Sequence, residues 1–138
     1  MIEATAHVDR SPEEVFDYAS NPTHEPEWNP RTRRVVKLTT GPSGVGARYE
    51  IEFIPGHPVT VECTAYDRPT AWAQVGQSLD TTFRWKGQVL PAARGADLIL
   101  RLEVEPHGLA RILAQFVSRR MRSELPHHVR SLASVLER

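Results

Sequence analysis

Hydrophobic residues recur at spacings of three and four along the C-terminal stretch from Gly108 to Arg138. This spacing places apolar side chains on one stripe of a helix, so it predicts a single long amphipathic helix. The stripe consists of Leu109, Ile112, Leu113, Phe116, Val117, Met121, Leu125, Val129, Leu132 and Leu136. A helix with one apolar stripe must bury it against another element, and the rest of the chain predicts only one large partner, a sheet.

Between residues 32 and 105 the hydrophobic period changes to two, which is the period of strands. Turns containing glycine or proline divide this stretch into six predicted strands, and a weaker alternation predicts a first strand near the N-terminus. The predicted strands cover residues 2–8, 32–40, 46–55, 58–67, 70–78, 80–91 and 95–105. Short connections of this kind favour an antiparallel meander.

Alternation within the strands predicts that one face of the sheet is dry. Tyr49, Ile51 and Phe53 alternate with charged residues, and Phe83 and Trp85 do the same further along the chain. An antiparallel sheet with one solvated face has this pattern. We expect the C-terminal helix to cover the dry face, because it is the longest apolar stripe in the chain.

Two short helices are predicted between the first strand and the meander. The motif Ser11-Pro12-Glu13-Glu14 provides a capping serine, a proline at the first helical position and a glutamate three residues after the cap. Asn21-Pro22 ends this helix, and a turn or second helix with one tryptophan follows at residues 24–30. The predicted fold class is therefore α+β, with residues 1–138 forming a single domain.

Several separated segments of the chain resemble one protein family. They are Ser11-Pro12-Glu13-Glu14-Val15-Phe16-Asp17-Tyr18, Asn21-Pro22, Glu25-Pro26-Glu27-Trp28-Asn29-Pro30, Gly44-Val45-Gly46-Ala47-Arg48-Tyr49 and Glu105-Pro106-His107-Gly108-Leu109. Taken in order, they resemble the polyketide cyclase/dehydrase branch of the START-like (Bet v 1-like, SRPBCC) superfamily. The resemblance implies a helix-grip fold, in which a curved seven-stranded antiparallel sheet wraps around the long C-terminal helix and leaves a cavity between them. Members of this superfamily bind lipids, hormones, quinones or polyketides, and some are aromatases or cyclases.

The residues that face the space between helix and sheet are the candidate lining of a ligand pocket. They are Trp28, Tyr49, Ile51, Phe53, Phe83, Trp85, Leu100, Leu113, Phe116, Val117 and Met121. Apolar walls with a few polar groups suit a small-molecule site. A filled core would need the same residues, and the resemblance favours the pocket. For Trp28 we weigh a lid over the cavity mouth against a plug that anchors the second helix, and we favour the plug.

The sequence assigns no catalytic residue. It contains no legible Ser/His/Asp or Cys/His arrangement and no phosphate-binding glycine loop. A cyclase would need a proton acceptor and an oxyanion-stabilising donor inside the pocket. Tyr49 and Tyr66 carry hydroxyls, whereas Glu50 and Arg84 are predicted to point outward. His128 lies near the apolar stripe as a candidate acid or base, and a partly buried, hydrogen-bonded histidine is the alternative that we favour.

No metal and no cofactor are expected. Glu124 and His128 share a helix face, but His127 points about 100° away from its neighbour, so both imidazoles do not easily meet one ion. Pro126 lies between them and is expected to kink or split the last helix. Cys63 is the single cysteine, which excludes intramolecular disulfides; we expect it to be a small buried residue.

The charge and hydropathy of the chain limit the classes of partner that it is expected to bind. The chain carries 17 basic and 17 acidic residues, so no strong overall field favours nucleic acid or membrane. The arginines of the last helix are expected to form a solvated face, and no nucleic-acid partner is expected; they are Arg111, Arg119, Arg120 and Arg122. No apolar run approaches the roughly 20 residues of a membrane span. With no signal peptide evident, we expect a cytoplasmic protein.

Three functions remain open at this stage. The first is binding of a small hydrophobic or amphipathic ligand, such as a lipid, quinone or polyketide-like molecule, between sheet and helix. The second is a polyketide cyclase or aromatase activity in the same cavity, which predicts an inward ionisable residue with a displaced pKa. The third is a protein-interaction module, which predicts a filled cavity and an exposed apolar patch. The sequence leaves the oligomeric state open.

Overall fold

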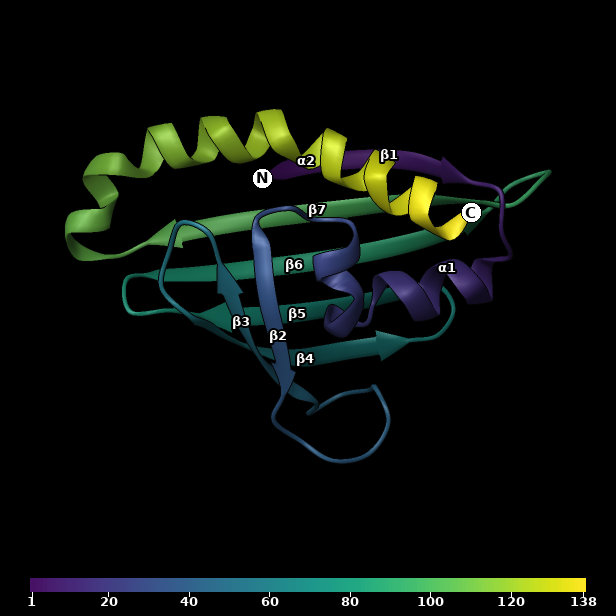
Figure 1. The fold of residues 1–138 in the computed structure, drawn as a ribbon, viewed down its shortest axis with the longest axis horizontal. Helices are drawn as coiled ribbons and strands as arrows, with labels where there is room; N and C mark the ends of the chain where they lie inside the picture. Colours follow the sequence, from purple (N-terminus) through teal and green to yellow (C-terminus); the bar gives the residue numbers. More distant parts are fainter.

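A computed structural model describes all 138 residues, and its elements follow the predicted order (Figure 1). The elements are β1 (Ile2–Val8), α1 (Pro12–Ala19), the 3-10 helix η1 (Pro22–Glu27), β2 (Thr32–Lys37), β3 (Arg48–Phe53), β4 (Val59–Asp67), β5 (Ala71–Gln77), β6 (Thr81–Pro91), β7 (Ala96–Pro106), the 3-10 helix η2 (Gly108–Leu113) and α2 (Ala114–Leu136). The seven strands form one antiparallel sheet in the order β1-β7-β6-β5-β4-β3-β2. The predicted α+β helix-grip architecture is confirmed.

The sheet is curled, so β2 and β3 cross in front of the longer strands β4 to β7 (Figure 1). The pairing of β4 with β5 shifts register between Cys63 and Ala65, which marks a bulge. A bulge inserts one residue, bends the strand and increases its twist. Cys63 is therefore the last of three alternating buried positions, as expected for a small buried residue, and Tyr66 resumes the inward direction after the extra residue.

Two strands are shorter than the sequence predicts. β2 ends at Lys37 and β3 begins at Arg48, so the residues between them form a loop. Gly41 and Gly46 have φ angles of +94° and +90°, a region that side chains with a Cβ rarely adopt. These backbone conformations interrupt the extended chain, and the hydrophobic alternation on either side does not reveal where it stops.

The first helix begins as predicted. Ser11 lies before it and its hydroxyl accepts a hydrogen bond from the Glu14 amide at 3.2 Å. The same hydroxyl donates to the Glu14 carboxylate at 3.1 Å, so the two side chains stabilise one turn together. η1 is capped in the same manner, because the Asn21 side chain accepts from the Thr23 amide at 3.1 Å.

The apolar interior consists of two clusters. The first joins β1, α1, the end of η1, β5, β6, β7 and the second half of α2, and it contains Ala4, Val8, Val15, Phe16, Trp28, Trp72, Val89, Ala96, Leu98, Val129, Leu132 and Ala133. The second lies under β3 and β4 and contains Ala47, Tyr49, Ile51, Val59, Val61 and Cys63. Trp28 belongs to the first cluster and is 8% exposed.

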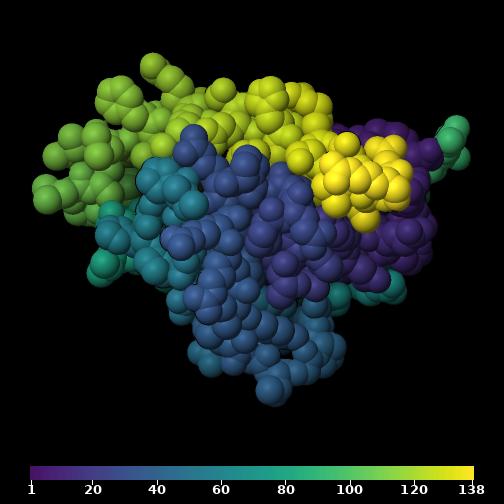
Figure 2. Space-filling view, viewed as in Figure 1, coloured from purple at the N-terminus to yellow at the C-terminus, as the bar shows by residue number.

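The C-terminal segment departs from the predicted single buried stripe. Its first turns form η2 rather than α-helix, and four stripe residues are exposed: Leu109, Ile112, Leu113 and Phe116. Only the second half of α2 reaches the core, through Val129 and Leu132. The sheet ends at Pro106, and Figure 2 shows η2 and the first turns of α2 projecting beyond the body of the molecule. The expectation of a fully buried stripe was therefore wrong.

Pro126 does not split the last helix. α2 runs without a break from Ala114 to Leu136 and curves along β1 in its second half (Figure 1). A proline removes one backbone hydrogen bond and favours such a bend, which neighbouring packing then stabilises. The alternative of two separate helices is wrong.

Candidate functional site

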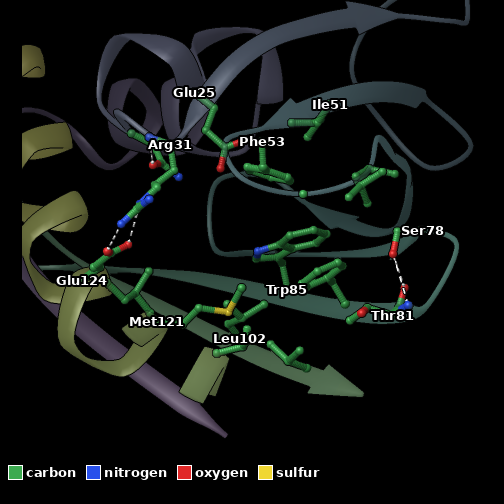
Figure 3. A pocket seen from close by; sticks show the side chains of 18 of the residues that line it. Glu25, Arg31, Ile51, Phe53, Ser78, Thr81, Trp85, Leu102, Met121 and Glu124 are labelled. Carbon is green, nitrogen blue, oxygen red and sulfur yellow. Dashed lines mark hydrogen bonds and ion pairs between the residues drawn. The ribbon is translucent and has the colours of Figure 1, made fainter. Parts of the chain in front are cut away.

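A cavity of about 500 Å³ lies between the inner face of the sheet, the segment from η1 to β2, and the first half of α2 (Figure 3). Ligand pockets for small molecules span roughly 300–1,000 Å³, so this space has the size of a binding site. Of the 38 residues that line it, 19 are hydrophobic, so the lining also contains polar and charged side chains. The predicted contact surface between helix and sheet therefore contains open space.

The structure brings most of the predicted lining residues together around this cavity. The residues that border it are Trp28, Ile51, Phe53, Phe83, Trp85, Leu100, Leu113, Val117 and Met121. Tyr49 does not border it, since its side chain is 2% exposed and packs in the second apolar cluster. Phe116 is 70% exposed, because it follows a different direction around α2 from the cavity-facing residues Leu113, Val117 and Met121.

Two glycines give the floor of the cavity its shape. Gly87 leaves space for the Trp72 ring, because a Cβ at this position would fall inside the indole. Gly76 does the same for Trp85, since a Cβ there would lie 2.6 Å from the ring and 2.8 Å from Val59. Trp85 also stacks on Phe83, with ring centroids 5.4 Å apart and an interplanar angle of 17°. Its indole is therefore held flat against the sheet.

Glu25 is the ionisable residue that the sequence analysis missed. It lies in η1, between the capping Asn21 and Trp28, and its carboxylate points into the cavity towards Trp85 (Figure 3). Burial disfavours the charged form and raises the pKa of Glu25 to about 7. Near neutral pH this group therefore both accepts and donates a proton, unlike an ordinary surface carboxylate.

An ion pair closes one side of the cavity. The Arg31 guanidinium donates to both carboxylate oxygens of Glu124, at 2.6 and 3.2 Å, and so ties the segment before β2 to α2 (Figure 3). Arg31 lowers the pKa of the Glu124 carboxyl below its usual range. His128 also lines the cavity, and burial lowers the pKa of its imidazole, so the neutral form is favoured.

Three further polar side chains differ in their relation to the cavity. Arg84 points outward and pairs with Glu105 at 2.8 Å. The Gln74 side chain borders the cavity and donates to the Ser20 carbonyl at 3.1 Å. Trp28 also borders the cavity, although its indole Nε1 is enclosed by protein atoms and has no hydrogen-bond partner among them. An unpaired buried donor of this kind costs stability.

No group of three or more His, Cys, Asp or Glu side chains is close enough to hold a metal ion. No helix is both long and apolar enough to cross a membrane. Sequence spacing alone did not identify Glu25 or Arg31 as cavity residues, because both lie in the irregular segment between α1 and β2. The only signal was that Glu25 falls in a segment that carries the family resemblance.

Solved structures support the same fold at low sequence identity. TTHA0849 of Thermus thermophilus has a TM-score of 0.79 at 15% identity, covering 98% of this chain and 95% of its own. Ara h 8.0201 has a TM-score of 0.68 at 13% identity, with 98% and 95% covered. DynU16, from the dynemicin biosynthetic locus, has a TM-score of 0.69 at 14% identity, with 99% and 46% covered. At these identities the likeness shows the fold alone.

A family model described as polyketide cyclase / dehydrase and lipid transport matches residues 1–137. No curated protein matches the chain significantly. The family match covers nearly the whole sequence and agrees with the curled seven-stranded sheet and the long C-terminal helix. The chain therefore belongs to the polyketide cyclase/dehydrase and lipid transport family, as the resemblance of its sequence indicated.

Proposed function

We propose that this protein binds a small amphipathic molecule in the cavity between the sheet and α2. The observation that carries the proposal is the cavity itself, about 500 Å³ of space bordered by Phe53, Trp85 and Met121 on facing elements. Each methylene group that a ligand transfers from water to such walls contributes about 0.8 kcal/mol. An apolar body of modest length therefore binds without any specific polar contact.

Glu25 and the ion pair of Arg31 with Glu124 lie on one side of the cavity, where they would contact the polar part of a ligand. Glu25 offers a carboxyl whose burial raises its pKa to about 7. A ligand carbonyl or hydroxyl would accept from the protonated carboxyl, and a hydroxyl would also donate to the ionised carboxylate. A purely aliphatic ligand would leave this carboxyl unpaired, so the site favours an oxygen-containing molecule such as a quinone, a polyketide or a lipid.

A second candidate function is proton transfer in a polyketide cyclase or dehydrase reaction. Glu25 favours it, because a general acid or base works best with a pKa near the working pH. The ionised carboxylate would accept a proton from a carbon beside a ligand carbonyl and later return it to a developing hydroxyl. Glu25→Gln separates the two functions. Turnover would be lost in the enzyme, whereas a binding protein would keep most of its affinity.

The first experiment is native mass spectrometry of the purified protein, followed by denaturation and identification of released small molecules. A co-purifying amphipathic molecule supports the proposal and names the ligand class. Thermal melting with a panel of fatty acids, quinones and aromatic polyketides follows, since a ligand at 100 times its Kd stabilises by about 2.7 kcal/mol. No mass shift and no stabilisation by any compound would contradict the cavity function.

A matched pair of variants shows where binding occurs. Val117→Trp fills the cavity from α2, whereas Phe116→Trp adds a similar side chain one position away, outside the cavity. We expect the first variant to lose at least about tenfold in affinity for a compound found in the panel, because the indole occupies ligand volume. The second should bind as the unaltered protein does. Equal loss in both variants would place the ligand elsewhere.

A further inference from the structure

Six large apolar side chains are exposed at one end of the molecule, and together we name them the apolar rim. They are Ile54, Leu79, Leu109, Ile112, Leu113 and Phe116, with exposed fractions from 51% to 85%. They come from three segments: the loop between β3 and β4, the turn between β5 and β6, and the start of the C-terminal helical segment. Monomeric proteins rarely expose so many large apolar side chains in one region.

The three segments surround one opening of the cavity. Ile54 and Leu113 line the cavity themselves, and Ser78 and Asp80, on either side of Leu79, do so as well. The start of η2 is attached to the turn between β5 and β6, because the His107 amide donates to the Asp80 carbonyl at 2.6 Å. In Figure 1 these segments lie together at the end of the sheet where η2 projects. The rim therefore borders the cavity mouth.

The same end is locally basic although the whole chain is neutral. From Pro106 to Ser123 the sequence has four arginines and no acidic residue: Arg111, Arg119, Arg120 and Arg122. All four are exposed, and none forms an ion pair. Among the nearby acidic groups, Glu105 is paired with Arg84, and Asp80 leaves one negative charge against the four arginines. The local charge available to a partner is thus positive.

We propose that the apolar rim docks the protein on an anionic membrane surface, with its cavity mouth facing the lipid. Exposed apolar side chains on one side and arginines beside them are the features that hold peripheral segments at the boundary of headgroups and acyl chains. The rim residues stand on three separate segments around an opening, so they form no continuous flat patch for a globular partner. A fluid bilayer surface adapts to such a ring.

Docking would let an apolar molecule pass between bilayer and cavity without crossing water. This transfer role rests on the proposed ligand-binding function, whereas the docking itself does not. The cavity-filling variant Val117→Trp distinguishes the two, because it should lose ligand and still bind vesicles. Failure of docking alone would leave the cavity function intact.

The test is co-sedimentation with two kinds of vesicle, phosphatidylcholine alone and phosphatidylcholine mixed with phosphatidylglycerol. We expect binding to the anionic vesicles at low salt and a marked decrease when the Debye length is shortened from about 10 Å at 0.1 M salt to about 3 Å at 1 M. Ile112→Ser combined with Phe116→Ser should weaken binding at least about tenfold. Arg119→Glu combined with Arg122→Glu should weaken it by about fivefold or more per arginine.

Matched controls lie on other surfaces of the molecule. Val45 is 70% exposed in the loop between β2 and β3, so Val45→Ser removes an equally exposed apolar side chain. Arg33 is exposed on β2 and forms no ion pair, so Arg33→Glu makes the same change in charge as either arginine substitution of the rim variant alone. Both controls should bind anionic vesicles as the unaltered protein does. The rim, arginine and control variants should melt normally, because the residues that they change are exposed.

Several results would overturn the proposal. One is no binding to anionic vesicles at low salt, and another is an equal loss in the rim variants and the controls. A third is sedimentation of the free protein as a dimer that Ile112→Ser with Phe116→Ser converts to a monomer. In that case the rim is covered by a second copy of the chain, and a membrane is not its partner.

Discussion

The two halves of the C-terminal helical segment have the same hydrophobic spacing and different surroundings. In the second half, Val129 and Leu132 are fully buried against β1, α1 and the neighbouring strands. In the first half, Val117 and Met121 border open space, and Ile112 and Phe116 face solvent. Periodicity therefore identifies the apolar face of a helix, and the length of the sheet beneath it decides whether that face packs, lines a cavity or stays exposed.

The largest expected effect comes from truncating each half in turn. Leu132→Ala should lower the free energy of unfolding by about 2–5 kcal/mol, because it leaves a cavity in a packed core. Ile112→Ala should change it by less than about 0.5 kcal/mol, since the side chain is 74% exposed. Urea denaturation of both variants measures the difference. Similar losses in the two would mean that the first half is also packed in solution.

The carboxyl in the cavity wall should make stability depend on pH in a direction opposite to that of ordinary paired carboxylates. Because the folded-state pKa of Glu25 lies near 7, above its ordinary value of 4.5, the folded protein retains a proton that the unfolded chain releases. Stability then falls as the pH rises through this window. The stability that Glu25→Gln gains over the unaltered protein should therefore be about 2–3 kcal/mol larger at pH 8 than at pH 5.

Denaturation at the two pH values measures the free energy of unfolding of the variant and of the unaltered protein. In the difference between the two proteins, the contributions of the other titrating groups cancel. Glu27→Gln is a useful control, since Glu27 lies in the same short helix but is exposed. His24 lowers the pKa of Glu27, so this control should lose a small amount of stability at pH 8. A constant difference for Glu25→Gln at pH 5 and pH 8 would show that Glu25 titrates normally.

The two glycines under the tryptophans should respond differently to a methyl group. Gly87→Ala drives a Cβ into the Trp72 ring, which is 5% exposed and packs edge-on against Phe16 at 5.3 Å. Trp72 borders the cavity but is packed in the first apolar cluster, so this variant should lose about 1–3 kcal/mol. Gly76→Ala displaces Trp85, which has the cavity beside it and can move there.

Gly76→Ala should therefore cost less stability than Gly87→Ala and lose more ligand affinity, because the displaced indole takes up cavity volume. Thermal melting measures the first quantity, and titration with a compound from the ligand panel measures the second. Both rings border the cavity, so the comparison separates a ring that is packed in the core from one that is only partly buried. Equal destabilisation with unchanged ligand affinity would show that the Trp85 ring does not move into the cavity.

The smallest expected effect is that of the ion pair between the middle of α2 and the segment before β2. Glu124→Gln removes one charge of a pair in which both side chains are partly exposed, so the cost should be about 0.5–1 kcal/mol. The cost should decrease in 1 M salt, because exposed charges are then screened. Glu137→Gln, at an unpaired acidic residue near the end of the same helix, should change stability by less than this at either salt concentration.

The sequence predicted the positions of helices and strands better than it predicted how deeply their side chains are buried. Strand β7 shows why, since Leu98 and Leu102 alternate with polar residues and the structure buries both. In contrast, hydrophobic spacing predicted the same burial for Leu109 and Leu132, of which the first is 83% exposed. Periodicity reports which side of an element is apolar, and it contains no information on where the opposing element ends.

The candidate site was predicted through its apolar part only. Most of the predicted lining residues border the cavity, because strands and helix alternate regularly there. Glu25 and Arg31 were missed as cavity residues, because they lie in a segment without periodicity and reach the cavity only after η1 turns back towards the sheet. Arg31 and Glu124 are 93 residues apart in sequence, so no local pattern connects them.

By itself, the sequence determined the order of strands and helices, the antiparallel meander, the start of α1 at Ser11 and the apolar character of the surfaces that face one another. These features follow from local spacing, capping and turn residues. Only the tertiary structure decided that the curled sheet leaves a cavity, that Glu25 is desolvated within it and that the first half of the last helix extends beyond the sheet. These features depend on distances between remote elements, which the bulge in β4 and the bend of the sheet set together.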